Sequence, residues 1–251
     1  MKTVLVTGMS GLLGGAVHRQ LTGKYELSAL NRHAVEGVKC TRADIGDLHK
    51  IQPAFKGIDT VVHLAGVAWR NRGPWEVYLE SNIVGTYNVF EASRIAGVKR
   101  IIFASSASTI RGSEMEPPYV SILQGRYAEV PQPWPKLTHE IPPRPVTMYG
   151  ATKVWGEALA RVYSNKYGIS VICLRIGVVN PEDKPTEPSH FAAWCSQRDV
   201  ARMVEKCIEA PSSVKFDIFY VTSNNKWGIM DLEHAKQVVG FVPEDSADKF
   251  A

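Results

Sequence analysis

A glycine-rich loop between an apolar strand and a helix constrains the fold of this chain more than any other segment. The loop Thr7–Gly14 (TGMSGLLG) follows the apolar run Thr3–Val6 and precedes a helical pattern with Ala16, Val17 and Leu21 on its apolar face. In such a loop one glycine permits a tight turn, one lets the backbone approach a pyrophosphate, and one lets the helix pack on the strand. The segment therefore predicts a dinucleotide-binding turn. An ordinary strand-to-helix turn is the alternative, and only other parts of the chain can decide between them.

A tyrosine and a lysine four residues apart form the second informative pattern. Tyr149 and Lys153 open a stretch with helical periodicity, so both side chains are expected on one helix face. A tyrosine titrates near pH ~10 unaided, but a neighbouring cation favours the phenolate and lowers that pKa. Such a pair can deprotonate a hydroxyl group while a nicotinamide takes the hydride. The alternative is a solvent-exposed helix face.

A strand that ends in hydroxyl groups supports the catalytic interpretation. The apolar run Arg100–Ala104 continues into Ser105, Ser106 and Ser108. Ligands of open parallel sheets bind at the carboxyl ends of the strands, where a hydroxyl group can donate to a substrate oxygen. Some of these serines are instead expected only to cap the next turn.

Alternating strands and helices predict an α/β fold, a doubly wound parallel (Rossmann) sheet in a single domain over residues 1–251. The expected strands are Thr3–Val6, Glu26–Leu30, Thr60–Leu64, Arg100–Ala104, Ser170–Arg175 and Phe216–Thr222. The expected helices are Gly11–Leu21, Ile51–Phe55, Trp75–Ile95, Tyr149–Tyr167 and Arg198–Glu209. Residues 176–251 are expected to contribute a small substrate-binding cap.

These motifs together resemble the extended short-chain dehydrogenase/reductase family, also described as the NAD-dependent epimerase/dehydratase family. Within it the chain is most similar to uronate dehydrogenases. That similarity rests on His63–Gly66, Phe103–Ser106, Leu174–Gly177, and Ala193–Ser196 with Asp199. Asp199 three residues after Ser196 also fits a helix-capping role.

The resemblance implies a catalytic triad of Ser106, Tyr149 and Lys153. With the glycine loop and the second strand end, the expected cofactor-binding residues are Gly8, Ser10, Gly11, Leu12, Leu13, Asn31, Arg32, Asp44, Ile45, Leu64, Ala65, Gly66, Asn82, Tyr149, Lys153 and Ile176. The expected substrate-binding residues are Ala68, Asn82, Ser106, Ala107, Ser108, Tyr149 and Arg175.

Two departures from uronate dehydrogenases concern the substrate. Those enzymes carry a serine where this chain has Ala68 and a histidine where it has Ser108, so the carboxylate site is incomplete. Arg175 is retained, and it serves either a sugar or the structure. The proline-rich segment 112–146 looks longer than in those enzymes. Its aromatic residues favour an ordered loop over the active site, because rings stack on sugar faces and disordered tracts contain few of them.

The second strand end bears on the choice of cofactor. Asn31 stands where an NAD enzyme would place an acid for the ribose hydroxyl groups, and Arg32 follows it. A guanidinium group matches a 2′-phosphate, which favours NADP slightly over NAD. In the alternative, Arg32 is an exposed turn residue and NAD is held through Asp44 and the loop.

Composition is consistent with a cytoplasmic enzyme. The 251 residues are 45% hydrophobic, and a net charge of +4 without basic runs predicts no nucleic-acid partner. The four cysteines are scattered and, with the seven histidines, show no metal-ligand spacing, so we expect reduced thiols and no metal. No apolar run is long enough for a membrane span, and no signal peptide is expected.

The patterns favour an NAD(P)-dependent oxidoreductase that acts on a sugar or sugar acid. A nucleotide-sugar epimerase or dehydratase, which returns the hydride to its substrate, is the first alternative. A non-catalytic dinucleotide-sensing protein is the second, and the intact Ser106, Tyr149 and Lys153 argue against it. The resemblance also implies a homodimer formed by the helices that begin near Trp75 and Tyr149.

Overall fold

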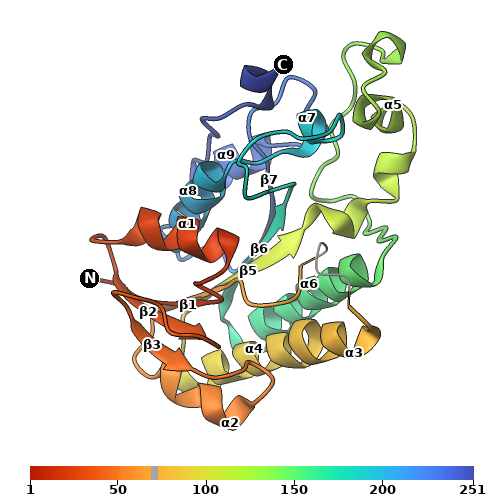
Figure 1. Ribbon diagram of the computed structural model, residues 1–251. Helices are drawn as coiled ribbons and strands as arrows, with labels where there is room; N and C mark the ends of the chain where they lie inside the picture. The colour runs from red at the N-terminus through yellow and green to blue at the C-terminus, as the bar shows by residue number, and fades with distance from the viewer. Residues whose placement is uncertain (69–72) are drawn as a thin grey trace.

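A parallel sheet forms the centre of the molecule. The computed structural model describes residues 1–68 and 73–251, and within these it contains a seven-stranded sheet with the order β3-β2-β1-β4-β5-β6-β7 (Figure 1). The strands are β1 (Thr3–Thr7), β2 (Glu26–Asn31), β3 (Lys39–Arg42), β4 (Thr60–His63), β5 (Arg100–Ser106), β6 (Ser170–Ile176) and β7 (Phe216–Val221). Neighbouring strands all run parallel. The predicted doubly wound α/β fold is confirmed.

Helices cover both faces of the sheet, which explains why its strands are almost continuously apolar. The α-helices are α1 (Leu12–Leu21), α2 (Leu48–Ile51), α3 (Trp75–Tyr78), α4 (Gly85–Ala96), α5 (Tyr119–Leu123), α6 (Met148–Tyr167), α7 (His190–Ala193), α8 (Gln197–Ile208) and α9 (Glu233–Val239). Helices α1, α8 and α9 lie on one face, and α2, α4 and α6 lie on the other (Figure 1). Strand β1 alternates accordingly, because Val4 and Val6 pack on the α1 side and Leu5 packs on the α4 side.

The proline-rich segment 112–146 contributes to a third apolar cluster. Ile122 of α5 and Leu137 pack with Tyr220 and with Ile229 and Met230 from the C-terminal part. In Figure 1 the segment that carries α5 lies beside α7. The segment includes two short 3₁₀ helices, Ser113–Met115 and Tyr127–Glu129.

Two aromatic side chains of this segment stack on Trp227, which lies in the C-terminal part of the chain. The ring centroids of Tyr127 and Trp227 are 4.0 Å apart, and those of Trp134 and Trp227 are 5.2 Å apart. Their stacking partner is thus Trp227, so the structure gives these two rings a packing role. Placement of the segment over a bound substrate stays a prediction.

Three local features differ from the expectations. Strand β3 was not predicted, because Lys39–Arg42 is a short edge strand without a buried residue. The expected helix Trp75–Ile95 is divided into α3, a π-helix at Leu79–Val84, and α4. The expected capping box at the start of α8 is only half formed. Ser196 Oγ accepts from the backbone N–H of Asp199 over 2.9 Å, but the backbone N–H of Ser196 donates to Ser223 Oγ instead of to the Asp199 carboxylate.

Candidate active site

The backbone of the glycine loop packs so tightly at Gly8 and Gly14 that neither position has room for a side chain. Gly8 has a φ of 72°, and a Cβ there would lie 2.8 Å from the backbone nitrogen of Ala65. A Cβ on Gly14 would lie 2.3 Å from the carbonyl oxygen of Gly8. Gly11 is the N-cap residue of helix α1 and has no side chain to cap it, so N–H groups of the first turn remain available to an anion. The residues present therefore fit a pyrophosphate group.

A cavity of about 200 Å³ opens beside this loop at the carboxyl ends of the strands. The residues predicted to bind the cofactor that line it are Gly8, Ser10, Gly11, Asn31, Arg32, Asp44, Ile45, Leu64, Ala65 and Gly66. They come from the ends of β1, β2 and β4 and from the turn after β3. Because strand order reverses between β1 and β4, this is the edge where a doubly wound sheet binds its ligand.

Asn31 and Arg32 have different environments at the end of β2. The Asn31 side chain is buried, and its Nδ2 donates to Ser10 Oγ over 2.8 Å and to the His33 carbonyl over 3.0 Å. Arg32 is exposed at the cavity and has no ion pair or hydrogen bond with the described residues. Asn31 thus shapes the loop, whereas the guanidinium group of Arg32 is available to a ligand.

The start of helix α6 brings Tyr149 to the end of β5. Thr147 caps the helix by accepting from the backbone N–H of Gly150 over 3.0 Å. A Cβ on Gly150 would lie 2.6 Å from the Ser108 carbonyl oxygen, so the helix packs directly on the 3₁₀ helix Ala107–Ile110. The Tyr149 phenol thereby lies close enough to the Ser106 hydroxyl group for that group to lower its pKa.

Burial dominates the electrostatics of the tyrosine and the lysine. The pKa of Tyr149 is raised by burial, and the hydrogen bond to Ser106 opposes that shift only in part. The expected lowering of this pKa by a cation is therefore wrong for the unliganded protein. Lys153 Nζ donates to the Ala104 carbonyl over 2.8 Å and lies 5.6 Å from the centre of the Tyr149 ring. Burial lowers the pKa of Lys153 to about 8, which leaves the amine mostly protonated at pH 7.

Asn82 connects the π-helix to the active-site backbone. Its Oδ1 accepts from the N–H of Val67 over 2.8 Å, and its Nδ2 donates to the Val67 carbonyl over 3.1 Å and to Thr152 Oγ1 over 3.2 Å. Thr152 Oγ1 in turn donates to the Tyr149 carbonyl over 2.7 Å. Asn82 therefore supports the backbone around the site, and Thr152 is a buried supporting residue that the sequence analysis did not identify.

Arg175 forms a buried ion pair. Its Nε and one terminal nitrogen donate to the two carboxylate oxygens of Glu157, each over 2.9 Å. Ser105 Oγ donates to the same carboxylate over 2.6 Å, and another Arg175 nitrogen donates to the Tyr220 hydroxyl over 3.2 Å. Arg175 is only 2% exposed. This geometry favours the structural role that the sequence left open.

The other predicted residues lie around the centre of the site. Ser108 donates its backbone N–H to Ser106 Oγ over 3.1 Å, which orients that hydroxyl group. Ile176 pairs with Ser106 in the sheet and is buried in the core. Leu12 and Leu13 form the first turn of α1, Ala107 follows β5, and Ala68 is exposed. His63 is buried between the hydroxyl groups of Thr7 and Thr86, and burial lowers its pKa to about 3.

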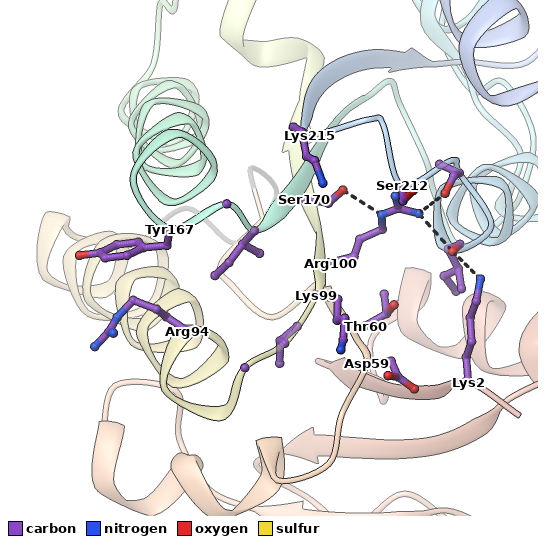
Figure 2. Close-up of a pocket in the computed structure, with 16 residues that line it drawn as sticks. Lys2, Asp59, Thr60, Arg94, Lys99, Arg100, Tyr167, Ser170, Ser212 and Lys215 are labelled. Atoms are coloured by element: carbon purple, nitrogen blue, oxygen red, sulfur yellow. Dashed lines mark hydrogen bonds between the residues drawn. The ribbon is translucent and has the colours of Figure 1, made fainter.

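A larger cavity of about 740 Å³ lies at the opposite edge of the sheet (Figure 2). Its lining includes Thr60, Arg100 and Ser170, which begin strands β4, β5 and β6. The guanidinium group of Arg100 donates to the carbonyls of Ala210 and Pro211, next to the end of α8. Its charge therefore satisfies backbone groups, and the cavity is separate from the candidate active site.

Comparisons with known proteins agree with this geometry. The sequence model of the family described as NAD-dependent epimerase/dehydratase matches residues 4–221. A uronate dehydrogenase of Agrobacterium fabrum is 32% identical over 255 residues, which cover 100% of this chain and 87% of the relative. An NAD-dependent glucose-6-phosphate dehydrogenase of Haloferax volcanii is 31% identical over 257 residues, which cover 98% of this chain and 95% of the relative.

A solved structure shows the same likeness. The crystal structure of a uronate dehydrogenase mutant from Agrobacterium tumefaciens, complexed with NAD, superposes with a TM-score of 0.82. The two chains are 30% identical, and the match covers 100% of this chain and 87% of that one. None of the described helices is long and apolar enough to cross a membrane.

Proposed function

The chain belongs to the NAD-dependent epimerase/dehydratase family, and from this premise we propose that it is an NAD(P)-dependent dehydrogenase of a sugar or sugar acid. The observation that carries the proposal is the meeting of Ser106, Tyr149 and Lys153 at the sheet edge that also carries the glycine loop. Relatives that match nearly the whole chain include uronate dehydrogenases, an NAD-dependent glucose-6-phosphate dehydrogenase and an L-arabinose 1-dehydrogenase.

The chemistry assigned to each residue follows from its position. A bound nicotinamide supplies the hydride acceptor. Ser106 donates to the substrate hydroxyl oxygen, and Tyr149 in its phenolate form accepts the proton of that hydroxyl group and becomes the neutral phenol. Lys153 holds positive charge near the tyrosine, which favours the phenolate, and would hydrogen-bond to the ribose of a bound cofactor. Asn82 and Thr152 act as positioning residues, because their hydrogen bonds end on the backbone of Val67 and Tyr149.

The cofactor preference depends on Arg32. We assign a slight preference for NADP, because the exposed guanidinium group at the cavity can pair with a 2′-phosphate. Asn31 supports this assignment, since its side-chain amide is engaged with Ser10 and His33 and offers no carboxylate to the ribose.

The substrate is proposed to be a free or simply modified sugar, oxidised at its anomeric carbon. The arginine that could bind a sugar carboxylate is instead paired with Glu157. Ala68 and Ser108 also lack the side chains that uronate dehydrogenases carry at these positions. A neutral aldose or a sugar phosphate therefore fits the site as well as a uronate does.

A substrate panel tests the proposal directly. Aldoses, sugar phosphates and uronates are incubated with NAD or NADP, and the absorbance of the reduced nicotinamide is followed. Net reduction with at least one sugar supports the dehydrogenase. Conversion of a nucleotide sugar without net reduction would establish the epimerase alternative, and dinucleotide binding without any turnover would establish the sensor.

We also propose a cytoplasmic homodimer. Its interface would use the large exposed hydrophobic residues on α3, α4, the π-helix between them, and α6. These are Trp75, Leu79, Val84, Tyr87, Ile95, Met148, Val162 and Tyr167. The four cysteines are free thiols, as in a reducing compartment. Light scattering that reports a monomer at micromolar concentration would contradict the dimer.

A further inference from the structure

Two histidines and an aspartate meet where the proline-rich segment, β7 and α9 come together. His139 belongs to the segment, Asp217 to β7 and His234 to α9. One potential ligand atom from each residue lies within 4.8 Å of the others. We infer that His139, Asp217 and His234 bind a divalent transition metal ion of the zinc type. This site goes beyond the proposed dehydrogenase activity and does not depend on it.

The side chains are already drawn together. His234 Nε2 and Asp217 Oδ1 are 2.8 Å apart, and the imidazole rings of His139 and His234 lie nearly parallel with centroids 3.7 Å apart. His139 Nδ1 is buried and has no hydrogen-bond partner among the described residues. A buried polar atom without a partner is costly, and a metal ion would provide its missing contact.

The charges around the cluster favour a cation. The carboxylates of Asp217, Glu140 and Asp231 are close enough to His139 to act on it electrostatically. Of the two arginines that line the adjoining cavity, Arg175 is compensated by Glu157, whereas Arg161 lies over the Phe216 ring at 3.4 Å and keeps its charge. The three carboxylates outnumber this one uncompensated arginine, which favours a bound cation.

The donor types select the class of metal. Two imidazole nitrogens and one carboxylate oxygen suit Zn²⁺ and its neighbours, whereas Mg²⁺ and Ca²⁺ prefer oxygen ligands alone. A metal ion lies close to the plane of each imidazole that binds it, so one of the two stacked rings turns when the ion enters. The cluster borders a cavity of about 650 Å³, from which water can supply a fourth ligand.

The site joins three segments that are distant in the sequence. The His139 carbonyl also accepts from Arg175 over 3.4 Å, which connects the segment to β6. A bound ion would hold the proline-rich segment against β7 and α9. It would thereby stabilise the folded chain through mass action, without entering the reaction.

Untagged protein is titrated calorimetrically with ZnCl₂ and, separately, with CoCl₂ while its visible absorption is recorded. The expected result is one ion per chain and a higher melting temperature with Zn²⁺, but no binding of Mg²⁺. Loss of a residue that only supports a metal ligand already weakens binding by about tenfold or more. Because His139→Gln and His234→Gln each remove a ligand itself, each should weaken Zn²⁺ binding by more than that. His49→Gln removes an exposed imidazole elsewhere and should bind as the wild type does.

Two results would overturn the site. One is wild-type protein that takes up no stoichiometric Zn²⁺, and the other is undiminished binding in folded His139→Gln and His234→Gln, as judged by circular dichroism. Neither readout depends on turnover, so failure here leaves the dehydrogenase proposal untouched.

Discussion

The Ser106 hydroxyl group at the carboxyl end of β5 lies close enough to the Tyr149 phenol in the first turn of α6 to lower its pKa. The contact depends on close packing, because Gly150 leaves no room between the helix and the Ser108 carbonyl. It also counteracts part of the burial that raises the pKa of Tyr149. This contact therefore helps to position the proposed base and offsets a part of the increase in its pKa.

Replacement of Tyr149 by phenylalanine tests the base. The ring and its packing are kept, so the fold and the cofactor affinity should remain. Turnover should fall by about 10²- to 10⁴-fold, the usual range for a lost acid or base. Steady-state kinetics with the best sugar of the panel, together with cofactor titration, measures both. Near-normal turnover would exclude the proposed role.

Replacement of Lys153 by methionine should lower turnover and, at neutral pH, raise the free energy of unfolding. The folded pKa of about 8 lies below the unfolded value of ~10.4, so the charged amine is disfavoured by folding. The charged amine therefore destabilises the folded protein by the full amount below pH ~8. The effect disappears as the pH rises through ~10.4, because the amine is then neutral in both the folded and the unfolded state. At pH 7 the variant should gain at most about 3 kcal/mol, less about 1 kcal/mol for the hydrogen bond to Ala104.

Urea denaturation of the two cofactor-free proteins between pH 7 and pH ~10.4 measures this difference. The advantage of Lys153→Met should shrink steadily across that range, while its turnover and its cofactor affinity are both reduced. A stability difference that does not change with pH would show that Lys153 is not desolvated in the folded protein.

Replacement of Arg32 by alanine should narrow or reverse the preference for NADP. A charge-assisted hydrogen bond contributes about 1.5 to 3 kcal/mol, or roughly ten- to a hundredfold in affinity. Calorimetric titration of both cofactors into wild type and variant decides the question. Equal wild-type affinities, or an unchanged NADP affinity in the variant, would make Arg32 a solvated turn residue.

Two adjacent glycines offer a matched comparison in α1. A Cβ on Gly14 meets backbone atoms of Gly8 and Met9, whereas a Cβ on Gly15 meets only the end of the Arg19 side chain at 3.6 Å. Gly14→Ala should therefore destabilise the loop and weaken dinucleotide binding. Gly15→Ala should stabilise the helix by about 0.5 to 1 kcal/mol, since alanine is the better helix former. Thermal unfolding and cofactor titration of both variants compare them, and equal effects would contradict the close packing of Gly14.

Replacement of Arg175 by methionine separates its two possible roles. The change leaves the Glu157 carboxylate buried without its cation, and breaking such a pair costs about 3 to 5 kcal/mol. Arg175→Met with Glu157→Leu should recover most of that loss, because no unpaired charge remains. Urea denaturation gives the stabilities. A stable Arg175→Met protein with only a raised KM would show that the arginine serves the substrate.

The sequence by itself determined the features that depend on neighbours within one element. The glycine spacing of residues 8–14, the four-residue interval from Tyr149 to Lys153, and the hydroxyl groups that end β5 are all local patterns. Parallel β-α alternation then places their ends at one edge of the sheet. The fold class and the glycine loop could be predicted for that reason, and the family resemblance added to them brought the number of predicted residues that line the adjoining cavity to ten.

Only the tertiary structure decided which partners the remaining side chains have. Arg175 could be assigned to Glu157, and Asn82 to Val67, only once β6, α6 and the π-helix were packed together. The residues His139, Asp217 and His234 come from three separate segments, so no motif in the sequence indicates that they form a cluster. The pKa of Tyr149 likewise follows from burial, which no interval in the sequence encodes. Local patterns specify which atoms face the same way along one element, and packing between elements decides which of those atoms meet.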